Sequence, residues 1–207
     1  MNTKSPAIPV KNMVIIALFT ALLCVVSPFS INIGPIPLSF ATLVIYLTAG
    51  TLNWKNGTIS VLLYIMLGAF GLPVFSGFGA GFQKIAGPTG GFIIGYIPLA
   101  LVTGLSAKTL DKNRFIQFTS GEKGENSASE RKALFSASRW LFIPGMAIGT
   151  VLLYTCGVFW FMVQAKASLI TALMACVVPF LIGDTIKIII AFIITPQLRA
   201  SLRFSRK

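Results

Sequence analysis

An aspartate and a lysine three residues apart, Asp184 and Lys187, have the strongest potential for chemistry in this sequence. Both lie in a long apolar stretch, where each charge costs roughly 2.5–3.5 kcal/mol at the centre of a membrane helix. A spacing of three puts the two side chains on one face of a helix, where they can neutralise each other. An acceptor beside a cation suits a ligand with N–H donors and a carboxylate. A purely structural ion pair is the alternative interpretation.

Residues Phe75, Phe78 and Gln83 are candidates for the wall of a small-molecule pocket. They lie in or beside the glycine-rich stretch 76–87, which predicts a structured loop. Small-molecule sites are usually apolar with a few polar groups. Aromatic residues are also common at a membrane interface without any ligand, so this pattern alone leaves both interpretations open.

The segment from Gly87 to Thr89 predicts the start of a helix, because a glycine precedes a proline at the first helical position. Free backbone N–H groups at such a start can bind an anion or a carbonyl oxygen. Gly87 also begins a row with Gly91 and Gly95 at a spacing of four. Such a row lets a neighbouring helix approach closely, and for this row we favour packing over ligand contact.

The residue types that the sequence lacks argue against catalysis. The sequence has no histidine, so it has no His-based triad and no HExxH zinc motif, and it lacks a GxxxxGK[ST] phosphate loop. We therefore expect no catalytic residues, no metal site and no cofactor, and any ATP hydrolysis must come from another chain. The net charge of +12 does not indicate nucleic acid, because the basic residues lie between apolar runs and not along one soluble face.

The elements that position these residues are six apolar runs. The chain of 207 residues is 55% hydrophobic and only 11% charged, whereas soluble domains are about a quarter charged. A membrane-spanning helix needs about 20 apolar residues. We predict an all-α integral membrane protein, a single membrane domain over residues 1–207. Its predicted transmembrane helices are at about 12–29, 38–53, 57–75, 88–107, 140–163 and 169–195.

The distribution of Lys and Arg predicts the orientation. With the N-terminus inside, 14 of the 17 basic residues fall on the inner side. Only Lys84 and Lys166 fall outside, and Lys187 lies within a helix. Positive residues mark the cytoplasmic side. We therefore expect both termini and the polar loop 108–139 to be cytoplasmic, with segments 30–37 and 76–87 outside.

Ala17 and Ala21 form a small-xxx-small pair on the first predicted helix. Such pairs let helices approach closely. The pair predicts either packing within the chain or a flat surface for a helix of another protein.

Several motifs together resemble the BioY family, the biotin-specific substrate-binding (S) components of energy-coupling factor (ECF) transporters. The resemblance extends over most of the chain. Ala17–Ala21 is similar to the family's AxxxA stretch, and Ile33–Pro37 to its first loop. The most specific match is Gly68–Phe75 followed by Gly87–Phe92, and Pro179–Lys187 resembles the sixth-helix motif.

The resemblance implies an ECF S-component fold of six transmembrane helices in the plasma membrane. It implies high-affinity binding of biotin near the outer face, for uptake by an ECF-type ABC importer. It also implies association with a transmembrane T component, through Ala17 and Ala21, and with two ATP-binding cassette ATPases. Asp184 and Lys187 match family positions that contact biotin. The chain departs from the family at Gln83-Lys84, where members more often have small or apolar residues.

For biotin, we assign Asp184 to the N–H groups of the ureido ring and Lys187 to the carboxylate. Phe75 and Phe78 would cover the thioether ring, and the helix start at Gly87–Thr89 could donate to a remaining oxygen. The opposite orientation of biotin is also open. Two other functions stay open: an S component for a different vitamin, and a membrane scaffold or channel in which Asp184 and Lys187 are structural.

Overall fold

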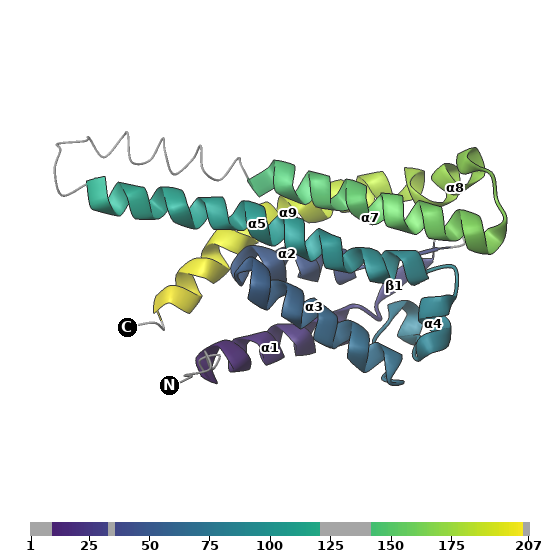
Figure 1. Ribbon diagram of the computed structural model, residues 1–207, viewed down its shortest axis with the longest axis horizontal. Helices are drawn as coiled ribbons and strands as arrows, with labels where there is room; N and C mark the ends of the chain where they lie inside the picture. The colour runs from purple at the N-terminus through teal and green to yellow at the C-terminus, as the bar shows by residue number, and fades with distance from the viewer. Residues whose placement is uncertain (1–9, 33–35, 121–141, 205–207) are drawn as a thin grey trace, which may run out of the picture.

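Long apolar segments fold into a bundle of helices that run along one axis (Figure 1). The computed structural model describes residues 10–32, 36–120 and 142–204. Figure 1 shows α4, α8 and β1 at one end of the bundle, and the start of α1 and the end of α9 at the other. The long helices are α1 (Val10–Val26), α2 (Ala41–Thr51), α3 (Trp54–Ala69), α5 (Gly90–Ser120), α7 (Phe142–Ala165) and α9 (Val178–Phe204).

Among the described residues, three segments have the length and composition to cross a bilayer: Gly90–Ala107, Phe142–Ala165 and Leu169–Arg199. The 24 residues of α7 extend about 36 Å, which exceeds the hydrocarbon thickness of about 30 Å. Val10–Val26 and Ala41–Thr51 are apolar but shorter. Helices therefore form at the predicted apolar runs, with different boundaries.

Helix α2 is short because a small antiparallel strand pair precedes it. Strand β1 (Ser30–Asn32) pairs with β2 (Pro37–Ser39), and Ser30 lies opposite Ser39. The sequence predicted a helix from residue 38, but α2 begins at Ala41. The Ser39 hydroxyl accepts a bond from the Ala41 amide at 3.0 Å, and Pro37 has no N–H to donate. The two strands bond each other, as backbone within a membrane protein requires.

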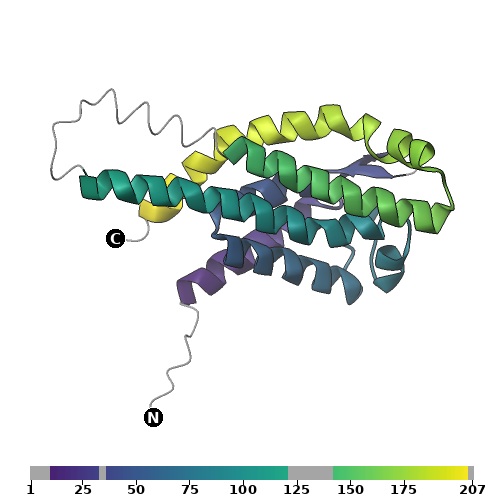
Figure 2. The ribbon, with the colours of Figure 1, turned by 45° about the horizontal axis from the view of Figure 1, so that its top comes forward.

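The last apolar run is two helices and not the single one predicted over 169–195. Helix α8 (Leu169–Cys176) ends before Val177, and α9 then extends to Phe204. Pro179 in the first turn of α9 has no amide to bond the preceding turn, so the helix is interrupted there. The break lets α8 lie across the end of the bundle (Figure 2).

Two further segments that were predicted as loops are partly helical. The stretch 76–87 contains a short 3₁₀ turn η1 (Ser76–Phe78) and a helix α4 (Phe82–Ala86). Gly81 precedes α4 with φ 81°, a left-handed conformation that favours glycine, so this residue lets the chain turn into the helix. Helix α5 continues to Ser120, into the predicted loop 108–139, and residues 121–139 lie outside the described part of the chain.

Helices α5 and α7 lie side by side along the bundle (Figures 1 and 2). A methyl group on Gly95 of α5 would lie 2.9 Å from Leu153 of α7, and one on Gly149 of α7 would lie 2.9 Å from Leu99 of α5. The absence of side chains at these glycines therefore permits the close approach. The predicted packing role of this glycine row is confirmed at Gly91 and Gly95, both of which face α7.

Candidate ligand-binding site

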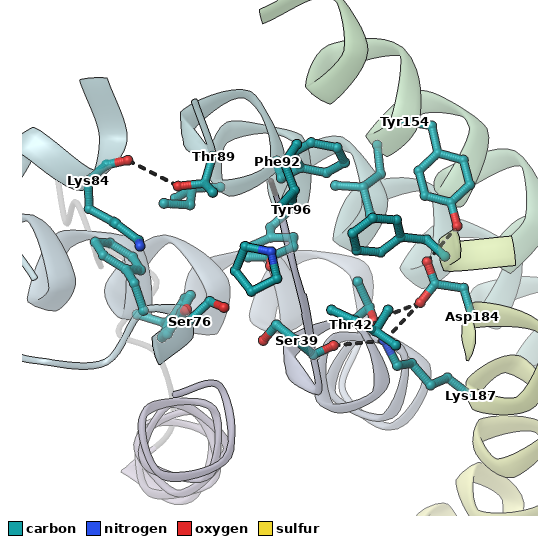
Figure 3. A pocket seen from close by; sticks show the side chains of 18 residues that line it. Ser39, Thr42, Ser76, Lys84, Thr89, Phe92, Tyr96, Tyr154, Asp184 and Lys187 are labelled. Atoms are coloured by element: carbon teal, nitrogen blue, oxygen red, sulfur yellow. Dashed lines mark hydrogen bonds and ion pairs between the residues drawn. The ribbon is translucent and has the colours of Figure 1, made fainter. Parts of the chain in front are cut away.

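A cavity lies at the N-terminal end of α2, beside strand β2 (Figure 3). Its walls come from β2, α2, α3, the segment 75–89, α5, α7 and α9. The residues that line it are Ile36, Pro37, Leu38, Ser39, Thr42, Tyr64, Phe75, Ser76, Lys84, Thr89, Phe92, Ile93, Tyr96, Leu153, Tyr154, Phe180, Asp184 and Lys187. Most are apolar or aromatic, and the charged ones lie on opposite sides in Figure 3.

Asp184 and Lys187 form a buried ion pair on one side of the cavity. The Lys187 Nζ lies 2.9 Å from Asp184 Oδ1, and the residues are 3% and 5% exposed. Their predicted proximity on one face of a helix is confirmed. The ammonium also donates to the Ser39 carbonyl at 2.7 Å and to the Thr42 hydroxyl at 2.9 Å. All three donors of Lys187 are therefore engaged within the protein.

The Asp184 carboxylate is held from two further helices. Its Oδ2 accepts a bond from the Tyr154 hydroxyl of α7 at 2.6 Å, and its Oδ1 accepts one from Thr42 of α2 at 3.3 Å. A carboxylate offers about four lone-pair sites. Among the described residues, three donors contact Asp184, so one site on Oδ2 is available to a ligand N–H.

The apolar walls are rings that rest against glycines. Phe92 stacks on Phe180 with ring centroids 6.3 Å apart. A methyl group on Gly157 would overlap the Phe92 ring, and one on Gly68 would lie 2.6 Å from atoms of the Phe75 ring. These glycines therefore set how deeply the two rings sit, and so the shape of the cavity.

The side of the cavity opposite Asp184 carries Lys84, Ser76 and Thr89 (Figure 3). The Thr89 hydroxyl donates to the Lys84 carbonyl at 3.4 Å. Lys84 is half-buried, and its ammonium points into the cavity in Figure 3. Of these three residues only Thr89 was predicted to contact the ligand; Lys84 and Ser76 were not part of the predicted site.

The structure brings together four of the seven predicted ligand residues: Asp184, Lys187, Phe75 and Thr89 all line the cavity. Phe78, Gln83 and Gly87 do not line it. Phe78 is 62% exposed and packs edge-to-face on Phe29, and Gln83 is exposed on α4. The Gly87 carbonyl accepts a bond from the Trp160 indole at 2.9 Å, which ties the start of α5 to α7.

Sequence reasoning missed the polar partners of the ion pair, Ser39, Thr42 and Tyr154. They lie 30 to 148 residues from their partners in the sequence, so no local spacing could have connected them. The one available signal was that a buried ion pair needs further hydrogen bonds. That requirement implies partners without saying which residues they are.

Ala17 and Ala21 lie on the exposed face of α1, away from this cavity. The opposite face of α1 buries Ile16, Phe19, Thr20 and Leu23. The pair therefore does not pack within the described part of the chain.

Comparison with known proteins adds independent evidence. The family model for the BioY family matches residues 1–204. The biotin transporter BioY of Thermotoga maritima is 34% identical over 182 residues, which cover 88% of this chain and 92% of the relative. The biotin transporter BioY of Rhizobium etli is 29% identical, covering 87% and 89% of the two chains.

A solved structure has the same fold. It is the crystal structure of the S-component for biotin from an ECF-type ABC transporter, and it aligns with a TM-score of 0.69 and 24% identity. The alignment covers 96% of this chain and 95% of the other. With a family match over nearly the whole length and, in the described part of the chain, three segments able to cross a bilayer, this membrane protein belongs to the BioY family.

Proposed function

We propose that this chain is the biotin-binding S component of an ECF-type ABC importer and that it binds biotin in the cavity beside Asp184. The observation on which the proposal depends is the cavity itself, which joins a buried carboxylate to aromatic walls. The relatives from Thermotoga maritima and Rhizobium etli are biotin transporters by name, which supports the choice of ligand.

Biotin has chemistry that fits this arrangement. Its ureido ring carries two N–H donors and a carbonyl, its thioether ring is apolar, and its side chain ends in a carboxylate. Asp184 accepts a hydrogen bond from the ureido ring through Oδ2, and a bond to an ionised acceptor is roughly twice as strong as a neutral one. Phe75, Phe92 and Phe180 surround the apolar ring. In this orientation Lys187 acts by holding the Asp184 carboxylate in place.

The proposal also includes the membrane topology and the partner proteins that transport requires. The chain crosses the plasma membrane six times, with both termini in the cytoplasm. Support comes from Figure 1, where the start of α1 and the end of α9 lie at the same end of the bundle, opposite α4 and α8. The exposed Ala17 and Ala21 dock against a transmembrane T component, and two ATP-binding cassette ATPases supply the energy.

Calorimetric titration of the purified protein in detergent tests the proposal. Wild type should bind biotin saturably and should not bind other vitamins, and Asp184→Asn should lose this binding. Saturable binding of a different vitamin would show that this vitamin, and not biotin, is the ligand. A folded wild type that binds no vitamin would leave the scaffold or channel interpretation.

A further inference from the structure

The position of Lys84 raises a question that the ion pair does not answer: which group receives the carboxylate of the ligand. The cavity has two lysines among the described residues that line it, Lys187 and Lys84. Lys187 already donates to Ser39, Thr42 and Asp184 at 2.7 to 2.9 Å. An ammonium has three donors, so a carboxylate would have to displace one of these buried partners.

Lys84 has no such partners among the described residues. Within the described ranges, no carboxylate lies within ion-pairing distance of Lys84, and no hydrogen bond from its ammonium is formed. The side chain is half-buried against the cavity, where a charge gains more from a partner than it would in water. Figure 3 shows the ammonium directed inward, across the cavity from Asp184 and Lys187.

A second unsatisfied group lies on the same side. The Ser76 hydroxyl lines the cavity and is buried, yet it has no hydrogen-bond partner among the described residues. Buried polar groups are rarely left unpaired without a reason such as a missing ligand. An ammonium and a hydroxyl together make two donors, which is what the two oxygens of a carboxylate accept.

The backbone holds these two donors near each other. Phe75 and Gly79 exchange two backbone hydrogen bonds, 3.0 and 3.2 Å long, and so close a tight loop around Ser76. The stem of Lys84 lies over Gly79, because a methyl group on that glycine would come within 2.8 Å of Lys84 Cε. Gly79 therefore places the Lys84 stem against the loop that contains Ser76.

We infer that Lys84, assisted by Ser76, binds the carboxylate of the ligand and makes the site selective for ligands with a free carboxylate over the corresponding amides. The inference rests on the proposed function, since it concerns the other end of the same ligand. Four methylene groups separate the carboxylate of biotin from the thioether ring, and the ureido ring is fused to the far side of that ring. The two polar ends of the ligand then match the two polar sides of the cavity, and Lys187 remains with Asp184.

Calorimetry with biotin and with biotinamide, which lacks the charge, tests the inference. Wild type should bind biotin about 10- to 100-fold more tightly than biotinamide, as expected for a hydrogen bond between charged groups. Lys84→Gln should bind both at about the affinity of wild type for biotinamide, and Lys84→Arg should restore the preference. Lys166→Gln, which removes an exposed lysine from the segment between α7 and α8, should behave as wild type.

A further variant moves Lys84 without removing its charge. Gly79→Ala keeps an allowed backbone, since φ is −68°, but its methyl group must displace the Lys84 stem. It should reduce the preference for biotin while binding of biotinamide stays unchanged.

Each other outcome has a definite meaning. Equal losses for both ligands in Lys84→Gln would make Lys84 structural and overturn the inference. If Lys84→Gln kept the full wild-type preference for biotin over biotinamide, the inference would also be overturned, because the carboxylate would then bind elsewhere. A wild type that binds both ligands equally would overturn the inference but leave the proposed function standing. A folded wild type that binds neither would overturn both.

Discussion

The Nζ of Lys187 lies 2.9 Å from Asp184 Oδ1, and this ion pair is closed off from solvent by groups on two other helices. Thr42 of α2 bonds both members of the pair, and Tyr154 of α7 bonds the carboxylate. The pair therefore joins α9 to α2 and α7 beside the cavity. The contribution of the pair to the stability of the protein and its contact with the ligand can be measured separately.

Replacing one member of the pair should cost stability, and replacing both should restore it. Asp184→Asn leaves the Lys187 charge buried without its counter-charge, which costs about 3–5 kcal/mol. The double variant Asp184→Asn with Lys187→Met removes the unpaired charge, so thermal unfolding in detergent should return toward wild type. Biotin binding should be lost in both. A double variant that binds biotin with wild-type affinity would show that the pair is structural only.

Tyr154→Phe should weaken both folding and binding. The variant removes a 2.6 Å bond to an ionised acceptor, worth about 1.5–3 kcal/mol, and frees the carboxylate to rotate. We expect a loss of at least about tenfold in biotin affinity by calorimetry.

Tyr46→Phe provides a matched control for this variant. The Tyr46 hydroxyl bonds Thr150 at the same distance, 2.6 Å, but Tyr46 does not line the cavity. It should lower stability by about 0.5–1.5 kcal/mol and leave affinity unchanged. Equal losses of affinity in the two variants would argue against a specific role for Tyr154.

Gly157→Ala should reshape the cavity through Phe92. Its methyl group overlaps the Phe92 ring, which lines the cavity and stacks on Phe180. Gly145→Ala, on the same helix, overlaps the Ser106 side chain away from the cavity. Each change should destabilise by about 1–3 kcal/mol, but only Gly157→Ala should reduce biotin affinity. Similar affinities in the two variants would show that the position of Phe92 does not matter for the ligand.

A bulky residue on the exposed face of α1 should block transport without affecting binding. Ala17→Trp and Ala21→Trp place a large ring on a surface that small residues keep flat. Uptake of labelled biotin by cells that contain the complete transporter should fall to background, while calorimetry on the isolated variants stays at wild type. Val151→Trp, on the exposed face of α7, should retain uptake. Normal uptake with tryptophan at position 17 or 21 would show that this face of α1 does not bind the partner.

The sequence by itself determined the class of the protein and the pair at its centre. Apolar runs of about 20 residues have one stable arrangement in lipid, in which each helix satisfies its own backbone, so the helices were predictable. The spacing of Asp184 and Lys187 was equally informative, because residues three apart meet on one helix face whatever surrounds them.

The tertiary structure decided what surrounds that pair. Ser39 and Lys187 are 148 residues apart, and their contact exists only because the strand pair shortens α2 and brings β2 against α9. The break at Val177 and the depth of Phe92 also depend on neighbours that sequence periodicity does not identify. Lys84 is the clearest case. It was an outer-loop charge in the sequence, and only the packing of its stem over Gly79 turned it toward the cavity.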